Sequence, residues 1–312
     1  MRVNLNNKDI TKYTSKLVWS GSDDQVARKV AFPILSSATD SHIPEIEIGL
    51  GDLIQVFEGA NEIFRGFVFK YDKEYQGTSI NVTAYEASIF LLKNYAAYNF
   101  KEITPEDITR KICGDFGIEV GSLAITGLPQ SFIEIGEHNL YEIISKAYRG
   151  AGKENGKEYK LGMNQGKIQL SEKGEIVIKG VLQEQSLTNS RYSENMEEMV
   201  NLVKIADGEG NTIAEVKNEQ SIKNYGQFQQ VVAAESDKDM QEVALNRLKG
   251  ISGEAEIEAV GNTGLTAGSG IELSDQYTGL VGVFRITGDT HQWANNKYTV
   301  KLNLDFQGIK EG

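Results

Sequence analysis

The side chains that could carry chemistry are few and scattered along the sequence. Three histidines, His42, His138 and His291, lie far apart, and none has another His or Cys at the spacing of a metal site. We expect each of them to be a surface or packing residue. Cys113 is the single cysteine. It lies beside Ile112 on a predicted helix, so we expect it to be a small core residue.

Two loops resemble ligand-binding loops at first reading. The glycine-rich stretch Gly261–Gly268 lacks the lysine of a phosphate-binding loop and precedes no helix, so we predict a flexible loop between strands. Residues 207–211, DGEGN, begin like a calcium loop. Thr212 stands where that loop needs glycine, however, and Asn218 where it needs glutamate. We therefore predict a hairpin turn there.

No combination of residues suggests a catalytic centre. The sequence has no G-x-S-x-G motif, and Gly268-Ser269-Gly270 precedes a strand rather than linking a strand to a helix. Carboxylate pairs such as Glu197-Glu198 carry little information among 44 acidic residues. We predict no catalytic, cofactor-binding or metal-binding residues and a protein that is not an enzyme.

Composition narrows the class of partner. The formal net charge of −12 argues against a protein that binds nucleic-acid phosphates stably. It is compatible with a surface past which nucleic acid slides. A single cysteine excludes an intrachain disulfide and favours a reducing compartment. The N-terminus does not resemble a signal peptide and no run reaches 18 apolar residues, so we expect no membrane insertion.

The strongest pattern is a repeated β-meander. Residues 51–84 read as three antiparallel strands, the last alternating apolar and polar residues with period two. Residues 270–304 repeat the same order and rough spacing. We interpret this as a duplication, in which Ile54 matches Ile271 and Val82 matches Leu302.

The glycines inside the two middle strands, Gly66 and Gly282, are expected to occupy equivalent places and to bend a curled sheet.

The remaining segments give the domain organisation. Residues 1–97 are predicted to form a first tube-like β-barrel domain. Residues 98–180 are predicted to be a peripheral α+β domain, with one helix starting at Thr104 and a second at about 140–148. Residues 181–312 are predicted to form a second tube-like β-barrel domain that includes a helix at 237–249. The predicted fold class is mainly β with an α+β insert, built from two similar tube-type β-barrels.

A series of motifs runs collinearly over nearly the whole chain through these segments: VWSGSDDQVARKVAF, GDLIQVFEGANEIFRGFVF, ITPEDITRKICGDFGIEVG, LYEIISKAY, MEEMVNLVKIADGEGNTIAEVKN, GLTAGSGIELSDQYTGLVGVFRITGDTHQW and YTVKLNLDF. This series resembles the baseplate hub proteins of contractile phage tails and phage-tail-like bacteriocins, and in particular the XkdQ-like hub family. No single segment is diagnostic; the specificity lies in their order.

The resemblance implies a structural protein without catalytic or cofactor residues. It implies a homotrimer whose paired barrels form a pseudo-sixfold ring between the hexameric tail tube and the trimeric central spike. The implied partners are the tail tube protein or a tube-terminating baseplate protein, the spike protein and the tape measure protein. The implied location is the baseplate of a virion or tail-like particle assembled in the bacterial host cytoplasm.

Other readings stay open at this point. A carbohydrate- or cell-wall-binding module is the alternative, because β-rich chains with exposed aromatic residues often bind sugars, and Trp19 and Trp293 lie in or near predicted strands. A cell-wall hydrolase is a third reading, which the lack of a nucleophile or metal set disfavours. The sequence does not distinguish an infectious phage from a bacteriocin.

Overall fold

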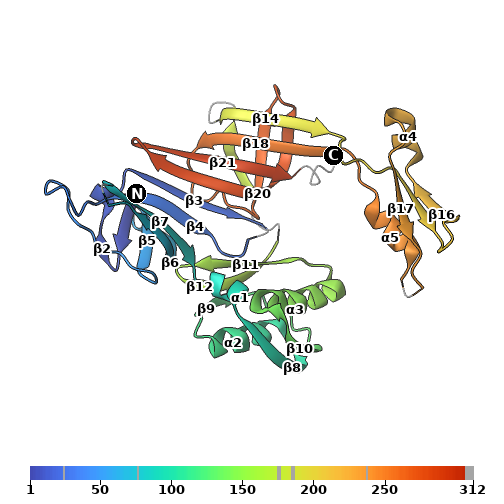
Figure 1. Cartoon of the computed structure of the whole chain (residues 1–312), viewed down its shortest axis with the longest axis horizontal. Coiled ribbons are helices and arrows are strands. Elements are labelled where there is room, and N and C mark those ends of the chain that lie inside the picture. The colour runs from blue at the N-terminus through green and yellow to red at the C-terminus, as the bar shows by residue number, and fades with distance from the viewer. Residues whose placement is uncertain (24, 76, 174–176, 184–186, 237, 306–312) are drawn as a thin grey trace. The chain divides into compact units, whose positions relative to one another are not determined.

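The computed structural model describes the chain except residues 24, 76, 174–176, 184–186, 237 and 306–312 (Figure 1). The described chain divides into two compact units, one formed by residues 1–190 with 256–312 and the other by Arg191–Ala255. The predicted bounds at 237 and 312 fall outside the described residues.

The first part of the larger unit is a curled sheet, which we call the N-terminal half-barrel. Its strands lie side by side in the order β3-β4-β7-β6-β5-β1-β2. The strands are β1 (Arg2–Leu5), β2 (Lys8–Asp9), β3 (Lys16–Ser22), β4 (Lys29–Leu35), β5 (Leu53–Glu58), β6 (Asn61–Lys73) and β7 (Ser79–Glu86), with a short 3₁₀ helix η1 (Thr11–Tyr13).

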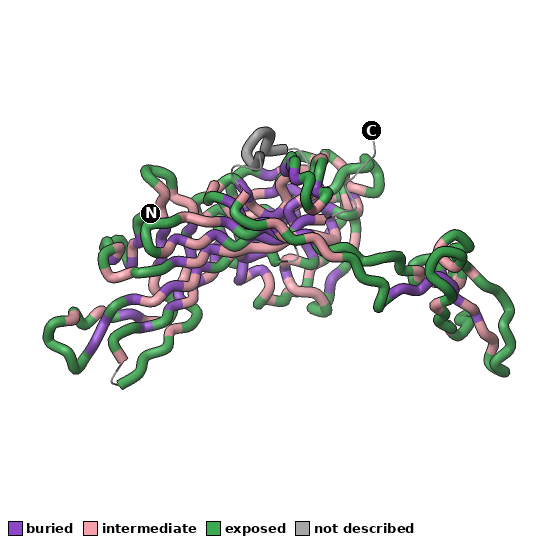
Figure 2. The backbone as a smooth tube through the Cα atoms, turned by 90° about the horizontal axis from the view of Figure 1, so that it is seen from above, coloured by how far each residue is buried: buried purple, intermediate pink, exposed green. Residues whose placement is uncertain are grey.

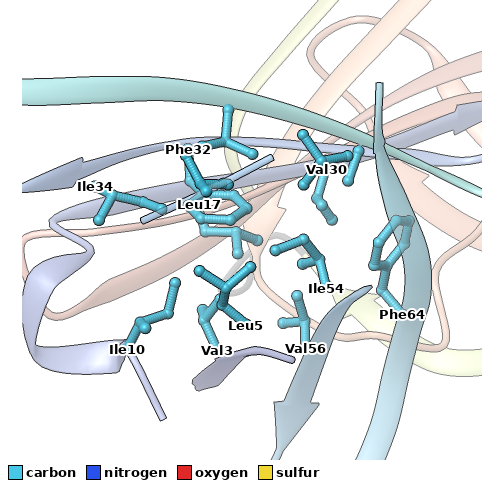
Figure 3. Packing of buried hydrophobic residues seen from close by; sticks show 14 of the residues in the cluster. Val3, Leu5, Ile10, Leu17, Val30, Phe32, Ile34, Ile54, Val56 and Phe64 are labelled. Carbon is cyan, nitrogen blue, oxygen red and sulfur yellow. The ribbon is translucent and has the colours of Figure 1, made fainter. Parts of the chain in front are cut away.

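The inward face of this sheet forms an aliphatic core. Val30, Phe32 and Ile34 occupy every second position of β4. Because successive side chains of a strand point to opposite faces, these three lie on the same face, and all three are buried. Figure 3 shows them facing Val3, Leu5, Ile10, Leu17, Ile54, Val56 and Phe64. Buried positions alternate with more exposed ones along the strands in the same way (Figure 2).

The second curled sheet, the C-terminal half-barrel, has a matching arrangement. Its strands lie in the order β14-β18-β21-β20, with β19 pairing β20 and β13 pairing β19. The strands are β13 (Val177–Gln183), β14 (Leu187–Asn195), β18 (Ser252–Val260), β19 (Gly270–Asp275), β20 (Leu280–Ala294) and β21 (Lys297–Asp305). The end of β14 and the start of β18 extend into the residue range of the smaller unit. β20 also pairs with β3, so both half-barrels belong to one 13-stranded sheet.

The two meanders share details of hydrogen-bond register. In β6, the Val68 N–H donates to the Asp52 carbonyl at 2.9 Å, and the Gly51 N–H donates to the Val68 carbonyl at 2.8 Å. In β20, Ile286 makes the same pair of bonds, with Ser269 at 2.9 Å and Gly268 at 2.7 Å. An irregularity in register follows at once in both strands. Val68 is therefore the counterpart of Ile286.

This register aligns Ile54 with Ile271 and Val82 with Leu302, in agreement with the sequence-based alignment. Whether the two half-barrels superpose as whole domains stays a prediction.

The expected equivalence of the two strand glycines is wrong. Gly66 pairs with Ile54, whereas the residue that pairs with Ile271 is Phe284, two positions beyond Gly282. The two positions also require glycine for different reasons. A Cβ on Gly66 would lie 2.2 Å from the Tyr85 carbonyl oxygen, whereas Gly282 has open space around it and a φ of +135°.

Between the two half-barrels, the chain forms the predicted α+β domain. Its elements are α1 (Ile89–Lys93), β8 (Tyr95–Ile103), α2 (Pro105–Asp115), β9 (Val120–Leu123), β10 (Gln130–Asn139), α3 (Leu140–Asn155), β11 (Tyr159–Asn164) and β12 (Lys167–Glu172). β8 pairs with β10, and β12 pairs with β11 and, in parallel, with β9. The core of this domain includes the fully buried Cys113, as the sequence predicts.

The domain bounds differ from those predicted. Leu91 already belongs to the α+β core, ahead of the predicted boundary at 97. The boundary predicted at 180 falls inside β13, which pairs with β19 of the C-terminal half-barrel.

Helix ends follow local capping. The Thr104 hydroxyl caps α2 by accepting the Asp107 N–H, as the sequence indicates. α3 begins with a capping box between Asn139 and Glu142. It continues past the predicted end near Tyr148 to Asn155, because the left-handed residue that terminates it is Gly156, with a φ of +73°.

The smaller unit, Arg191–Ala255, has its own sheet and core. β15 (Leu202–Ala206) lies between β16 (Thr212–Lys217) and β17 (Gln229–Ala233). Two helices complete the unit, α4 (Glu219–Tyr225) and α5 (Met240–Arg247). The predicted helix at 237–249 therefore does not belong to the second β-barrel domain: in α5, Ala244 packs into a core with Val203 and Ile205.

Candidate assembly joint between the two half-barrels

The seam between the two half-barrels is a pair of antiparallel strands. β20 is long enough to have two neighbours on one edge: β19 pairs with its first half up to Arg285, and β3 pairs with it from Gly288 to Ala294. The seam therefore joins segments that lie about 270 residues apart in the sequence. No group of His, Cys, Asp and Glu side chains in the described part of the chain could hold a metal ion.

A buried ion pair crosses the seam. The Arg28 guanidinium, which follows β3 in the chain, donates from both terminal nitrogens to the Asp289 carboxylate on β20, with Nη1 2.9 Å from Oδ2. The Asp289 side chain is completely buried. The guanidinium carbon also lies 4.0 Å from the centre of the Trp19 ring, a favourable cation–π arrangement. This pairing fixes the two half-barrels to each other.

The charge on Asp289 is stabilised by its partners. Burial alone would raise the pKa of this carboxyl, but the hydrogen bonds from Arg28 and His291 outweigh it and hold the pKa at about 2. The Ala267 N–H adds a further hydrogen bond to Oδ2, at 2.8 Å. Asp289 is therefore ionised across the physiological pH range.

His291 is the centre of a second hydrogen-bond set in the seam. It is fully buried, and its Nε2 lies 3.0 Å from the Leu265 carbonyl oxygen and 3.1 Å from Asp289 Oδ1. Because both of those atoms only accept, Nε2 is the donor. Nδ1 lies 2.8 Å from the Tyr298 hydroxyl. Burial raises the pKa of Tyr298, so this hydroxyl stays protonated.

Glu86, at the end of β7, anchors the backbone of Arg28. Its carboxylate accepts the Arg28 N–H at 3.1 Å, and its own N–H donates to the Arg28 carbonyl at 3.1 Å. The residue is 4% exposed. Burial raises the pKa of this carboxyl to about 7, against the opposing effect of Arg28.

The α+β domain reaches the same seam through Lys160 on β11. Its ammonium donates to the Ala267 carbonyl and lies 3.4 Å from Asp23. Asp23 also pairs with Arg285 of β20. Burial lowers the pKa of Lys160. A cavity of about 280 Å³ lies beside these groups and is lined by residues of all three parts, including Trp19, Arg28, Glu86, Lys160 and Thr266.

The structure does not bring the sequence's candidate residues together. His42 lies on an exposed loop, and His138 contacts Glu134 in the α+β domain at 2.9 Å. Residues 207–211 form the predicted hairpin turn, in which Asp207 accepts the N–H groups of Glu209 and Asn211. The loop Gly261–Gly268 lies between β18 and β19, as predicted, and its backbone contacts Asp289 and His291.

The contacts across the seam were not predicted from the sequence, although a signal was present. Asp289, His291 and Trp293 recur with period two, which places them on one face of a strand. That face is buried. Polar residues on a buried face need partners, and no local neighbour in the sequence supplies them.

Trp19 and Trp293 are 5% and 8% exposed, so neither offers a surface for stacking a sugar. Within the described residues, no helix is both long and apolar enough to cross a bilayer.

The chain is similar to known phage proteins in sequence and in fold. The phage-like element PBSX protein XkdQ of Bacillus subtilis is 25% identical over 269 residues, which cover 81% of each chain.

Two solved structures share the fold. The 43 kDa tail protein of prophage MuSo2 from Shewanella oneidensis has a TM-score of 0.71 at 14% identity, covering 97% of both chains. A tail protein from Neisseria meningitidis MC58 has a TM-score of 0.66 at 13% identity, covering 99% of this chain and 96% of that one.

The sequence profile of the YqbQ-like family matches residues 17–305. That match covers most of the chain, including the C-terminal half-barrel, the N-terminal half-barrel apart from β1 and β2, and the strands that meet at the seam. The chain therefore belongs to the YqbQ-like family.

Proposed function

We propose that this chain is the structural baseplate hub of a contractile phage tail or phage-tail-like particle. Three copies form a pseudo-sixfold ring, which joins the hexameric tail tube to the trimeric central spike. The partners are further copies of the chain, the tube protein or a tube-terminating baseplate protein, the spike protein and the tape measure protein. The particle is assembled in the cytoplasm of the bacterial host.

One observation carries the proposal: the same strand order occurs twice in one chain, within one continuous sheet. A subunit with two similar surfaces can match a sixfold partner on one side while obeying threefold symmetry on the other. The proposed domains are two tube-like barrels, corresponding to the half-barrels, and the α+β domain between them. The similarity to a PBSX protein and to prophage tail proteins supports the same assignment.

The role is structural in this proposal. The buried polar groups at the seam pair with one another: Arg28 with Asp289, and His291 with Tyr298. Such an arrangement holds parts of a protein together.

The decisive experiment is to measure the oligomeric state and image the particle. Light scattering on the purified chain, alone and with a spike protein from the same particle, is expected to give a trimer in at least one case. Negative-stain images are expected to show a ring with a central channel. A monomer under both conditions would contradict the hub assignment.

Two further assays separate this role from its alternatives. We expect no measurable binding of double-stranded DNA at physiological salt, since the net charge is −12. We also expect the chain neither to pellet with purified cell wall nor to release soluble fragments from it. Pelleting would favour the cell-wall-binding alternative, and released fragments would favour a hydrolase.

A further inference from the structure

We infer that the last part of β6, Phe69–Lys73, pairs with the outer edge of β14 in a second copy of this chain. The pairing repeats between chains the joint that β20 and β3 make within one chain. The inference rests on the proposed ring and names the strand edges that close it.

The first step is the equivalence of β6 and β20. Beyond the matched residues Val68 and Ile286, β20 continues along β3, with Asp289 opposite Gly21 and His291 opposite Trp19. β6 continues beyond Val68 only to Lys73, whereas β20 continues beyond Ile286 to Ala294, and the neighbours of β6 are different. Its residues from Lys70 to Lys73 pair with β7 on one edge. In the described part of the chain, no strand pairs with the other edge beyond Val68.

The backbone N–H and C=O groups of this edge are oriented for pairing with a further strand. Tyr71 pairs with Val82 as Asp289 pairs with Leu302, and Lys73 pairs with Ile80 as His291 pairs with Val300. Tyr71 and Lys73 are thus the counterparts of the two residues that face β3. Because N–H and C=O directions alternate along a strand, their backbone groups point to the open edge.

The second step identifies the complementary strand. β3 comes first in the order β3-β4-β7-β6, and the same position in β14-β18-β21-β20 belongs to β14. β14 is the end of the sheet, and among the described strands only β18 pairs with it. Each chain therefore offers one open β6 edge and one open β14 edge. A contact of this head-to-tail kind closes into a ring when copies are related by rotation.

The third step concerns charge. The side chains of Lys70 and Asp72 are 67% and 55% exposed, and Lys73 is exposed as well. Charged residues protect an open strand edge from unspecific pairing before its proper partner arrives. β14 carries the exposed residues Arg191 and Glu194, which offer both signs of charge to that edge. A second copy is therefore the occupant that the strand order supports.

Cysteine cross-linking tests the pairing directly. Asp72→Cys is combined in one chain with Arg191→Cys, Ser193→Cys or Asn195→Cys, which alternate along β14 and so sample one face. Cys113 is fully buried and does not compete. The control combines Asp72→Cys with Glu272→Cys, an exposed residue on β19. After mild oxidation, gels without reductant are expected to show covalent dimers and trimers for at least one β14 pair and for no control.

A proline variant provides a second readout. Lys73→Pro removes an N–H that faces the open edge, so we expect the trimer fraction to fall at least tenfold. Circular dichroism and thermal unfolding are expected to stay as in the unmodified chain. Glu74→Pro, one residue beyond β6, is the matched control and is expected to retain the trimer.

The outcomes separate the two proposals. A trimer that forms but cross-links at none of the three β14 positions would overturn the edge pairing and leave the hub assignment standing. Covalent linkage of β6 to a different protein of the particle would also overturn it, because the occupant would not be a second copy. A chain that stays monomeric alone and with a spike protein would overturn the hub assignment itself.

Discussion

The second halves of β6 and β20 follow equivalent paths from equivalent hydrogen bonds, yet their chemistry is opposite. β20 presents Asp289 and His291, both buried and both bonded to other parts of the chain. β6 presents Tyr71 and Lys73 at the corresponding places, on an edge with exposed charge. A joint inside one chain forms once, during folding, so a buried ion pair can lock it. A strand edge that pairs with another chain is exposed to water before assembly, so charged side chains are needed there to prevent unspecific pairing.

The largest expected effect comes from breaking the buried ion pair of β20. Asp289→Asn keeps the shape of the side chain but leaves the Arg28 charge buried without its counter-charge. We expect a loss of about 3–5 kcal/mol in the free energy of unfolding, measured by urea denaturation.

The matched variant in β6 is Asp72→Asn, which removes an exposed pair between Asp72 and Lys70 with atoms 3.0 Å apart. We expect a change within about 0.5 kcal/mol. Equal losses for the two variants would contradict the contrast between the two strands.

The next effect concerns pH. The pKa of Glu86 is about 7 in the folded chain and 4.5 in its ordinary state, so the folded chain binds the proton more tightly. Its stabilising contribution is full below pH 4.5 and is lost as the pH rises to 7, by about 3 kcal/mol in total. Glu86→Gln cannot ionise, so the decline between these pH values should shrink by that amount. Denaturation curves with unchanged pH dependence would refute this assignment.

The two strand glycines give a third comparison. Gly66→Ala would press a methyl group against the Tyr85 carbonyl oxygen at 2.2 Å, and the backbone of β7 would have to move. We expect a loss of about 2–3 kcal/mol in unfolding free energy. Gly282→Ala meets no atom within 4 Å and suffers only from its φ of +135°, so we expect about 1–2 kcal/mol. A larger loss at Gly282 would reverse the roles assigned to the two positions.

The smallest effect is expected from one hydroxyl group. Tyr298→Phe removes the partner of His291 Nδ1 and leaves a buried nitrogen unpaired, at a cost of about 1–2 kcal/mol. Tyr75→Phe is the control, because Tyr75 is 85% exposed and its hydroxyl can be replaced by water. Thermal unfolding should shift for the first variant only. A shift of the same size in both would mean that the hydrogen bond to His291 contributes nothing specific.

Local features of the sequence were enough to predict many elements correctly. The alternation of Tyr298–Leu304 indicates a strand with one buried face, and β21 has Val300, Leu302 and Leu304 buried. Thr104 marks the start of α2, and residues 207–211 form a turn. These predictions succeed because capping, turns and two-residue alternation depend on residues close together in the chain.

The sequence by itself determined many of the strands, the starts of α2 and α3, and the order of the two meanders. Only the tertiary structure decided that β3 pairs with β20, that α5 belongs to the smaller unit, and that Arg28 meets Asp289. Strand pairing is made by backbone groups that are nearly the same in every residue, so the sequence of an edge strand does not indicate which strand pairs with it. Arg28 and Asp289 acquire their roles because folding brings together positions 261 residues apart and removes water from both.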